Sequence, residues 1–140
     1  FQKVTEKSKD NPVFYVQYAY ARINSIFRIL NLNIDDEIKL EKEKFIFNNY
    51  EREILRKVAE WPKRIEITLT KFQPHIIPSY LYELSTLFHA YWNMGNNNKD
   101  FRFIVDNKIS NKSRLLLLQS LEIVINNGMS ILGVSTPKSM

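Results

Sequence analysis

The chain has 140 residues, 44% of them hydrophobic and 25% charged, with a formal net charge of +5, so one folded domain fits and intrinsic disorder is excluded. The absence of cysteine excludes a disulfide scaffold, a thiol nucleophile and a cysteine-based zinc site. Few glycines and prolines favour helices, and the positive charge favours a polyanionic partner.

The first predicted element is a long helix. Residues 1–10 are polar without a hydrophobic period, so we expect a tail or linker from an upstream domain, followed by one domain over residues 11–140. Asn11 and Pro12 signal a helix start, because Asn can accept from free N–H groups and Pro suits the first turn. Apolar residues then recur at helical spacing to about Asn31: Val16, Ala19, Ile23, Ile26 and Leu30.

Two shorter helices are predicted next, after a charge-dense stretch over residues 33–44. Asn48 and Glu51 have capping-box spacing, and Trp61-Pro62 should end the helix that they start. Residues Lys63 to Phe72 fit either an alternating strand or one helical face. A lone strand would lack a partner, so we predict a helix there.

Two further helices complete the predicted domain. Pro74 and Pro78 bracket the start of one, whose apolar stripe is clear from Ser79 and which ends at Gly95 and the asparagines that follow, residues 96–98. The other runs from about Ser113 to a C-terminal cap at Asn127-Gly128. Residues 101–109 should form a mixed connection, and residues 129–132 a short apolar turn. The predicted fold is therefore all-α, a bundle of about five helices.

The sequence offers little for catalysis. His75 and His89 lack metal-ligand spacing, and we find no phosphate-binding glycine loop or nucleophile motif. We therefore predict no catalytic, metal-binding or cofactor-binding residue in this chain. Carboxylate pairs such as Asp35-Asp36 are typical of a solvated surface.

The first helix carries the best candidates for RNA contacts. Tyr18 and Arg22, four residues apart, are neighbours on one flank of its apolar stripe, where they could stack on a base and contact a phosphate together. The alternative is a tyrosine at the core edge beside a solvated arginine. Two other sets are either plain surface or recognition faces: Tyr82, Thr86, His89 and Asn93, and the basic residues Arg52, Arg56, Lys57, Lys63 and Arg64.

Four segments, in order along nearly the whole chain, resemble arginyl-tRNA synthetases. Residues 11–22, NPVFYVQYAYAR, are similar to the family segment NPVxYVQYAHAR. Residues 79–84 and 88–89 resemble its YLYELxxxFH helix, and residues 127–134 its NGLxLLGI element. The ending PKSM is similar to the usual PERM. Tyr20 stands where the family commonly has His, and Lys138-Ser139 replaces Glu-Arg.

The resemblance implies the C-terminal, all-α anticodon-binding (DALR) domain of such an enzyme. The parent would be a cytoplasmic class I arginine–tRNA ligase that uses ATP, with magnesium, to attach arginine to tRNA(Arg). The catalytic domain and its HIGH signature do not occur in this sequence, so the fragment itself should be inactive. Expected partners are the anticodon stem-loop of tRNA(Arg) and the upstream catalytic domain, with no membrane and no DNA.

We expect Tyr18 and Arg22 to be the principal tRNA contacts. Further candidates are Gln17, Tyr20, Asn24, Trp92, Asn93 and Met140. The alternative function is a helical protein–protein interaction module without RNA binding, which the aromatic content and the lack of a catalytic set would also fit.

Overall fold

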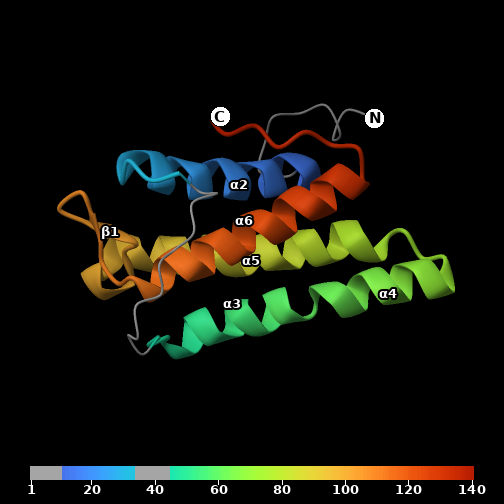
Figure 1. Ribbon diagram of the computed structural model, residues 1–140, viewed down its shortest axis with the longest axis horizontal. Coiled ribbons are helices and arrows are strands. Elements are labelled where there is room, and N and C mark those ends of the chain that lie inside the picture. The colour runs from blue at the N-terminus through green and yellow to red at the C-terminus, as the bar shows by residue number, and fades with distance from the viewer. Residues whose placement is uncertain (1–10, 34–44) are drawn as a thin grey trace.

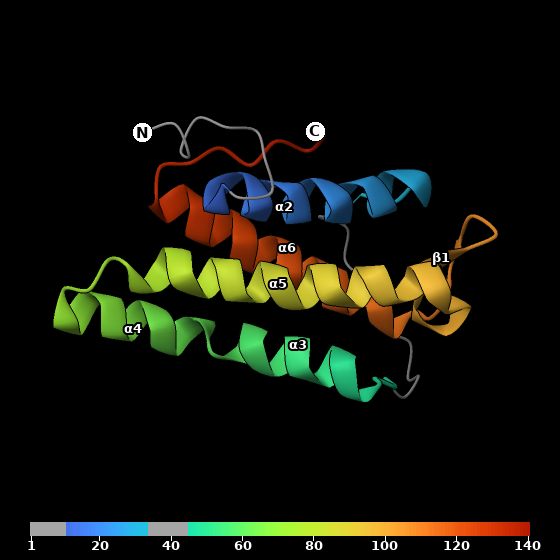
Figure 2. The ribbon, with the colours of Figure 1, turned by 180° about the vertical axis from the view of Figure 1, so that it is seen from behind.

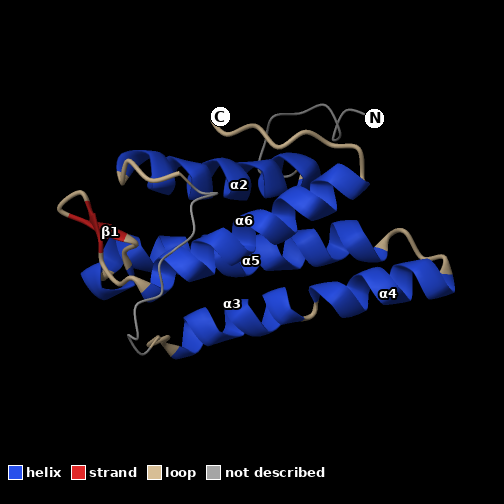
Figure 3. Cartoon of the chain, viewed as in Figure 1, coloured by secondary structure: helices blue, strands red, loops and turns tan. Residues whose placement is uncertain are grey.

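The computed structural model describes residues 11–33 and 45–140, so our expectations for residues 1–10 and 34–44 lie outside the described part. Within it, the chain forms five α-helices, one 3-10 helix and a two-stranded hairpin (Figure 3). The all-α prediction is confirmed. The elements are α2 (Pro12–Ile29), α3 (Asn49–Ala59), α4 (Trp61–Lys71), α5 (Ile76–Asn97), η1 (Lys99–Phe101), β1 (Ile104–Val105), β2 (Lys108–Ile109) and α6 (Ser113–Ile131).

Helix α5 is the centre of the bundle and contacts the other four α-helices. Helices α2 and α5 run in the same direction, whereas α3, α4 and α6 run in the opposite one (Figure 1). Helices α3 and α4 follow each other along one side of α5, and α2 lies on the other side in both views (Figure 2). The β1–β2 hairpin lies at the end of the bundle where α2 and α5 finish.

The core forms where the apolar stripes of these helices meet. Removing such side chains from water is the main term that stabilises the bundle. The predicted stripes of α2, α5 and α6 are confirmed, because each supplies fully buried side chains: Ile23, Leu81, Leu84, Phe88, Leu117, Leu118, Leu121 and Ile125.

The predicted helix starts hold in the first half of the chain. Asn11 accepts hydrogen bonds from the N–H groups of Val13 and Phe14 and caps α2. Asn48 and Glu51 form the reciprocal capping box of α3. The ambiguous stretch over residues 63–72 is helical to Lys71, as predicted, and belongs to α4, and Phe72 caps its end.

The predicted bounds of α5 hold. Helix α5 begins at Ile76, between Pro74 and Pro78, and Pro78 lies in its first turn, where a missing N–H costs no helical hydrogen bond. It ends at Asn97, among the predicted residues 95–98. The predicted end of α6 was wrong. Helix α6 continues through Asn127-Gly128 to Ile131, so residues 129–131 are helical and form no separate turn.

Gly128 explains why the cap prediction failed. A Cβ at this position would lie 2.7 Å from a methyl carbon of Leu81, so the glycine allows α6 to approach α5 closely. Its role is steric and does not require a left-handed backbone. The left-handed glycine lies farther on, at Gly133, with a φ of 70°.

Candidate nucleic-acid interface

The Tyr18–Arg22 pair meets two side chains of α5. The guanidinium carbon of Arg22 lies 4.3 Å from the ring centre of Tyr18 and 5.0 Å from that of Trp92. Its Nη2 donates to the Tyr18 hydroxyl at 3.0 Å, and its Nη1 lies 3.2 Å from Nδ1 of His89. We call Tyr18, Arg22, His89 and Trp92 the arginine cluster. It places a half-buried cation between two aromatic rings.

His89 orients the arginine. Because a guanidinium can only donate hydrogen bonds, Nδ1 of His89 must accept from it. The ring proton then resides on Nε2, which donates to the backbone carbonyl of Tyr15 at 3.2 Å. The His89 ring also packs against Tyr15, with 4.5 Å between ring centres, and against Tyr18 at 5.6 Å.

His89 was named on the predicted polar face of α5 but was missing from the predicted tRNA contacts. It is buried, because Tyr15 and Tyr18 of α2 pack against its ring. Its neighbours on the same face are exposed, namely Tyr82, Thr86 and Asn93. Two sequence signals pointed to His89: its helical spacing from Tyr82 and its place in the segment that resembles the YLYELxxxFH helix. The partner helix cannot be derived from that spacing.

The other flank of α2 holds the C-terminal tail. Gln17 donates from Nε2 to the carbonyl of Ser135 at 2.8 Å. The buried Tyr20 donates its hydroxyl to Oε1 of Glu122 at 2.9 Å, and Asn24 donates back to the carbonyl of Tyr20. Burial, together with the hydrogen bond and charge of Glu122, raises the pKa of Tyr20 above its ordinary value. The structure therefore separates these three predicted residues from the arginine cluster.

The tail passes along the outer side of α2 and ends at Met140 (Figure 1). The hydroxyl of Thr136 donates to Asn126 at 2.8 Å, which anchors the start of the tail to α6. Met140 itself is 53% exposed. A cavity of about 260 Å³ lies beside the tail, lined by Asn24, Phe27, Arg28, Leu32, Asn33 and Lys138.

A larger cavity, of about 410 Å³, lies beside Trp92. Its walls come from the last turns of α2 and α5 and from the segment around the hairpin. Its lining is mainly apolar and includes Ile26, Ile29, Phe101, Phe103 and Ile104. Trp92 is therefore shared between the arginine cluster and this apolar cavity.

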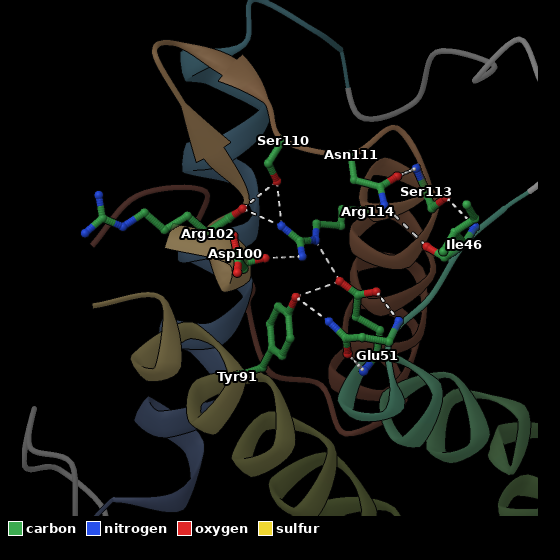
Figure 4. Close-up of polar contacts among 10 residues, drawn as sticks. Ile46, Glu51, Tyr91, Asp100, Arg102, Ser110, Asn111, Ser113 and Arg114 are labelled. Atoms are coloured by element: carbon green, nitrogen blue, oxygen red, sulfur yellow. Dashed lines mark hydrogen bonds and ion pairs between the residues drawn. The ribbon is translucent and has the colours of Figure 1, made fainter. Parts of the chain in front are cut away.

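A buried polar network holds that cavity wall in place (Figure 4). Nε of Arg114 pairs with Oε1 of Glu51 at 2.6 Å, and their side chains are only 8% and 1% exposed. Arg114 also donates to the carbonyls of Arg102 and Asp100 and to the hydroxyl of Ser110, each at 2.6 Å. One arginine of α6 thus ties α3 to the connection between α5 and α6.

Tyr91 completes this network from α5. Its hydroxyl donates to Oε1 of Glu51 at 2.6 Å and accepts from Nδ2 of Asn48 at 3.2 Å. Burial, and next the hydrogen bond to Glu51, raise the pKa of Tyr91 above its ordinary value. The sequence did not indicate this network, since its acid and base lie 63 positions apart and show no periodic relation.

Three of the six basic residues of α3 and α4 are paired with acids: Lys57, Lys63 and Arg64. Nη2 of Arg64 lies 2.8 Å from Oε2 of Glu60, and Nζ of Lys63 lies 3.0 Å from Oε2 of Glu66. Lys57 pairs with both Glu60 and Glu83. The hydrogen bond from Arg64 is the main reason that the pKa of Glu60 falls below its ordinary value. This side of the bundle therefore presents less free positive charge than its composition indicates.

Residues 11–33 and 45–140 contain no group of three or more His, Cys, Asp or Glu side chains that could hold a metal ion. Among the helices described here, none has both the length and the apolar character needed to cross a membrane.

Comparison with known proteins matches residues 16–140 to the DALR anticodon binding domain. An arginine–tRNA ligase of Pelagibacter ubique is 50% identical over all of this chain, which spans 24% of that relative. The fold also matches two solved structures of lower identity. A candidate arginyl-tRNA synthetase of Campylobacter jejuni has a TM-score of 0.80 at 23% identity, with 99% of this chain and 29% of that chain covered.

The second structure is the arginyl-tRNA synthetase of Thermus thermophilus, with a TM-score of 0.70 at 22% identity, covering 100% of this chain and 23% of that one. This chain thus spans about a quarter of the length of the curated relatives that it matches. From the family match and the full-length coverage by ligase sequences, we conclude that the chain belongs to the DALR anticodon-binding domain family.

Proposed function

We propose that this chain binds the anticodon arm of tRNA(Arg) as one part of a cytoplasmic arginine–tRNA ligase. The observation that carries the proposal is the arginine cluster. It presents a half-buried guanidinium between Tyr18 and Trp92 in a domain whose net charge is +5. Family membership makes the anticodon arm the partner to test first.

The cluster suits a single-stranded loop, because unpaired bases can stack on aromatic rings while phosphates meet cations. Arg22 has five N–H donors, and the contacts to Tyr18 and His89 engage only its two terminal nitrogens. Its side chain is already held in one geometry, so binding would cost less conformational entropy than it would for a free arginine. We assign the direct contacts to Tyr18, Arg22 and Trp92.

The remaining candidates fall into two groups. Asn93 is exposed directly after Trp92 and could read a base edge through its amide. Gln17, Tyr20 and Asn24 act as positioning residues in this proposal, because Gln17 and Tyr20 are held on the tail side of α2. Their contacts direct the tail so that the exposed Met140 can meet the RNA.

ATP and magnesium, which the parent ligase would use, do not fit the residues described here. That part of the chain holds no acidic or histidine cluster suited to a metal. We therefore assign the attachment of arginine to the remaining three quarters of the polypeptide, and tRNA binding to this domain.

Titration of a tRNA(Arg) anticodon stem-loop against Arg22→Ala tests the proposal. We expect Kd to rise by about tenfold or more, since a specific arginine contact contributes about 1–3 kcal/mol. Tyr18→Phe removes only the hydroxyl that holds Arg22, and we expect a smaller rise. Arg52→Ala is the matched control, because Arg52 is an exposed arginine on α3.

Salt separates the proposal from its alternative. Binding to wild type should weaken steeply as salt increases, and Arg22→Ala should show a shallower dependence because one phosphate contact is lost. Equal affinities of folded Arg22→Ala and Arg52→Ala would contradict the assignment. No binding to any tRNA by the wild-type protein would favour a protein–protein interaction module.

A further inference from the structure

The apolar stripe of α4 extends beyond the part of the bundle that covers it. Trp61, at the start of α4, is 8% exposed and stacks on Tyr80 of α5. Ile65, one turn later, is half-buried against the core. Leu69 is 68% exposed and Phe72, directly after the helix, 89% exposed. One amphipathic face thus goes from buried to uncovered over three turns.

Phe72 is also held in an unusual backbone conformation. It ends α4 with a φ of 52°, in the left-handed region that favours glycine. An aromatic side chain gains nothing from that backbone, and the described residues cover almost none of its surface. A fully exposed Phe at a strained position indicates that the side chain has a use outside the described part of the chain.

The uncovered stripe lies at the end of the bundle where α2 begins. Contacts between Tyr15 and Tyr82, and between Tyr18 and His89, show that α2 and α5 run side by side in the same direction. The α4–α5 turn that carries Phe72 therefore lies at the end where α2 begins and projects beyond it (Figures 1 and 2). Pro12, the first residue of α2, also lies toward this end of the bundle.

We propose that Leu69 and Phe72 seat the part of the same polypeptide that lies outside this domain. Relatives are about four times as long as this chain, so about three quarters of such a polypeptide would lie outside this domain. An apolar contact at this end would fix the angle between this domain and the rest of the enzyme. The inference rests on the proposed function, since it requires the longer ligase.

RNA is a poorer occupant for this surface. The stripe belongs to α4, which lies on the opposite side of α5 from α2 (Figure 1), and α2 is the helix that carries Arg22. Of the cations of α4, Lys63 and Arg64 pair with Glu66 and Glu60, and Lys71 is exposed in the last turn. The surface therefore offers mainly aliphatic and aromatic area beside one exposed lysine, which suits a protein face rather than a phosphate backbone.

A photocrosslinker tests the proposal in the full-length ligase. Benzoylphenylalanine in place of Phe72 should give an intramolecular crosslink that mass spectrometry maps outside residues 1–140. The same probe in place of Tyr50 is the control, because Tyr50 is 48% exposed at the start of α3, at the other end of the bundle. A crosslink from position 72 to tRNA or to a second copy, or none at all, would overturn the proposal.

Phe72→Gly gives an independent test, because glycine accepts the left-handed backbone without cost and the bundle should fold unchanged. In the full-length ligase we expect aminoacylation kcat/KM to fall by about fivefold or more, the usual lower size of coupling between separate sites. The Kd for the anticodon stem-loop should stay at the wild-type value. Unchanged kcat/KM would refute the docking role. A changed stem-loop Kd would also contradict it, because Phe72 would then contact the RNA. The Arg22→Ala titration remains the separate test of RNA binding.

Discussion

Replacement of Arg114 by Met removes the cation from the most buried ion pair among the described residues while keeping an apolar stem of similar length. Arg114 donates four hydrogen bonds, to Glu51, Asp100, Arg102 and Ser110. At about 0.5–1.5 kcal/mol each, they sum to about 2–6 kcal/mol. Removal of one partner of a buried pair costs about 3–5 kcal/mol, which agrees with that sum.

Urea unfolding followed by circular dichroism should therefore show a loss of about 3–5 kcal/mol for Arg114→Met. Hydrogen exchange should also rise at residues 104–109, since the hairpin loses its tie to α6. Glu51→Gln should cost a similar amount. The double variant should cost less than the sum of the two, because neither charge is then left buried alone.

Arg52→Met is the control for this series. Arg52 is exposed on α3, beside Glu51 in sequence, and its replacement should change stability by no more than about 0.5 kcal/mol. A loss below about 1 kcal/mol for Arg114→Met, or strict additivity in the double variant, would refute the reasoning from the buried pair.

Two smaller predictions concern packing and titration. Gly128→Ala should destabilise the domain by about 1–3 kcal/mol, measured by urea unfolding, because its Cβ would overlap Leu81; an unchanged midpoint would contradict the close approach of α5 and α6. Burial raises the pKa of Tyr20, Tyr80 and Tyr91 above the value of 10.0 that they have when unfolded. Their contribution to the free energy of unfolding is therefore fully present below pH 10 and is lost as pH rises toward the folded pKa values. The pH midpoint of alkaline unfolding should fall when urea is added, because urea lowers the remaining stability.

Local signals predicted the helices well because each carries its own evidence in sequence. An apolar period shows which face of a helix is buried, and Asn11 and Asn48 show where two helices start. The dipeptide Asn127-Gly128 shows the limit of such signals. A glycine that ends a helix and a glycine that admits a neighbouring helix look the same until Leu81 is placed across from it.

The candidate site was predictable to the same extent. Tyr18 and Arg22 lie on one helix at neighbouring positions, so spacing alone identified the pair. Trp92 and His89 come from another helix, and their place beside Arg22 depends on how α2 packs against α5. Glu51 and Arg114 are the extreme case, because their pairing depends on the whole bundle.

Burial separates the predicted tRNA contacts on α2 into residues that can reach a ligand and residues that hold the fold. Tyr18 and Arg22 are half-buried and keep ring surface and N–H donors at the edge of the domain. Tyr20 is buried, and its hydroxyl is directed to Glu122 below the C-terminal tail. Position 20, where Tyr replaces the His of the NPVxYVQYAHAR pattern that this segment resembles, therefore falls on the flank that holds the tail. In the proposed tRNA complex, a change there would therefore act through the placement of Met140, whereas a change at Arg22 would remove a direct contact.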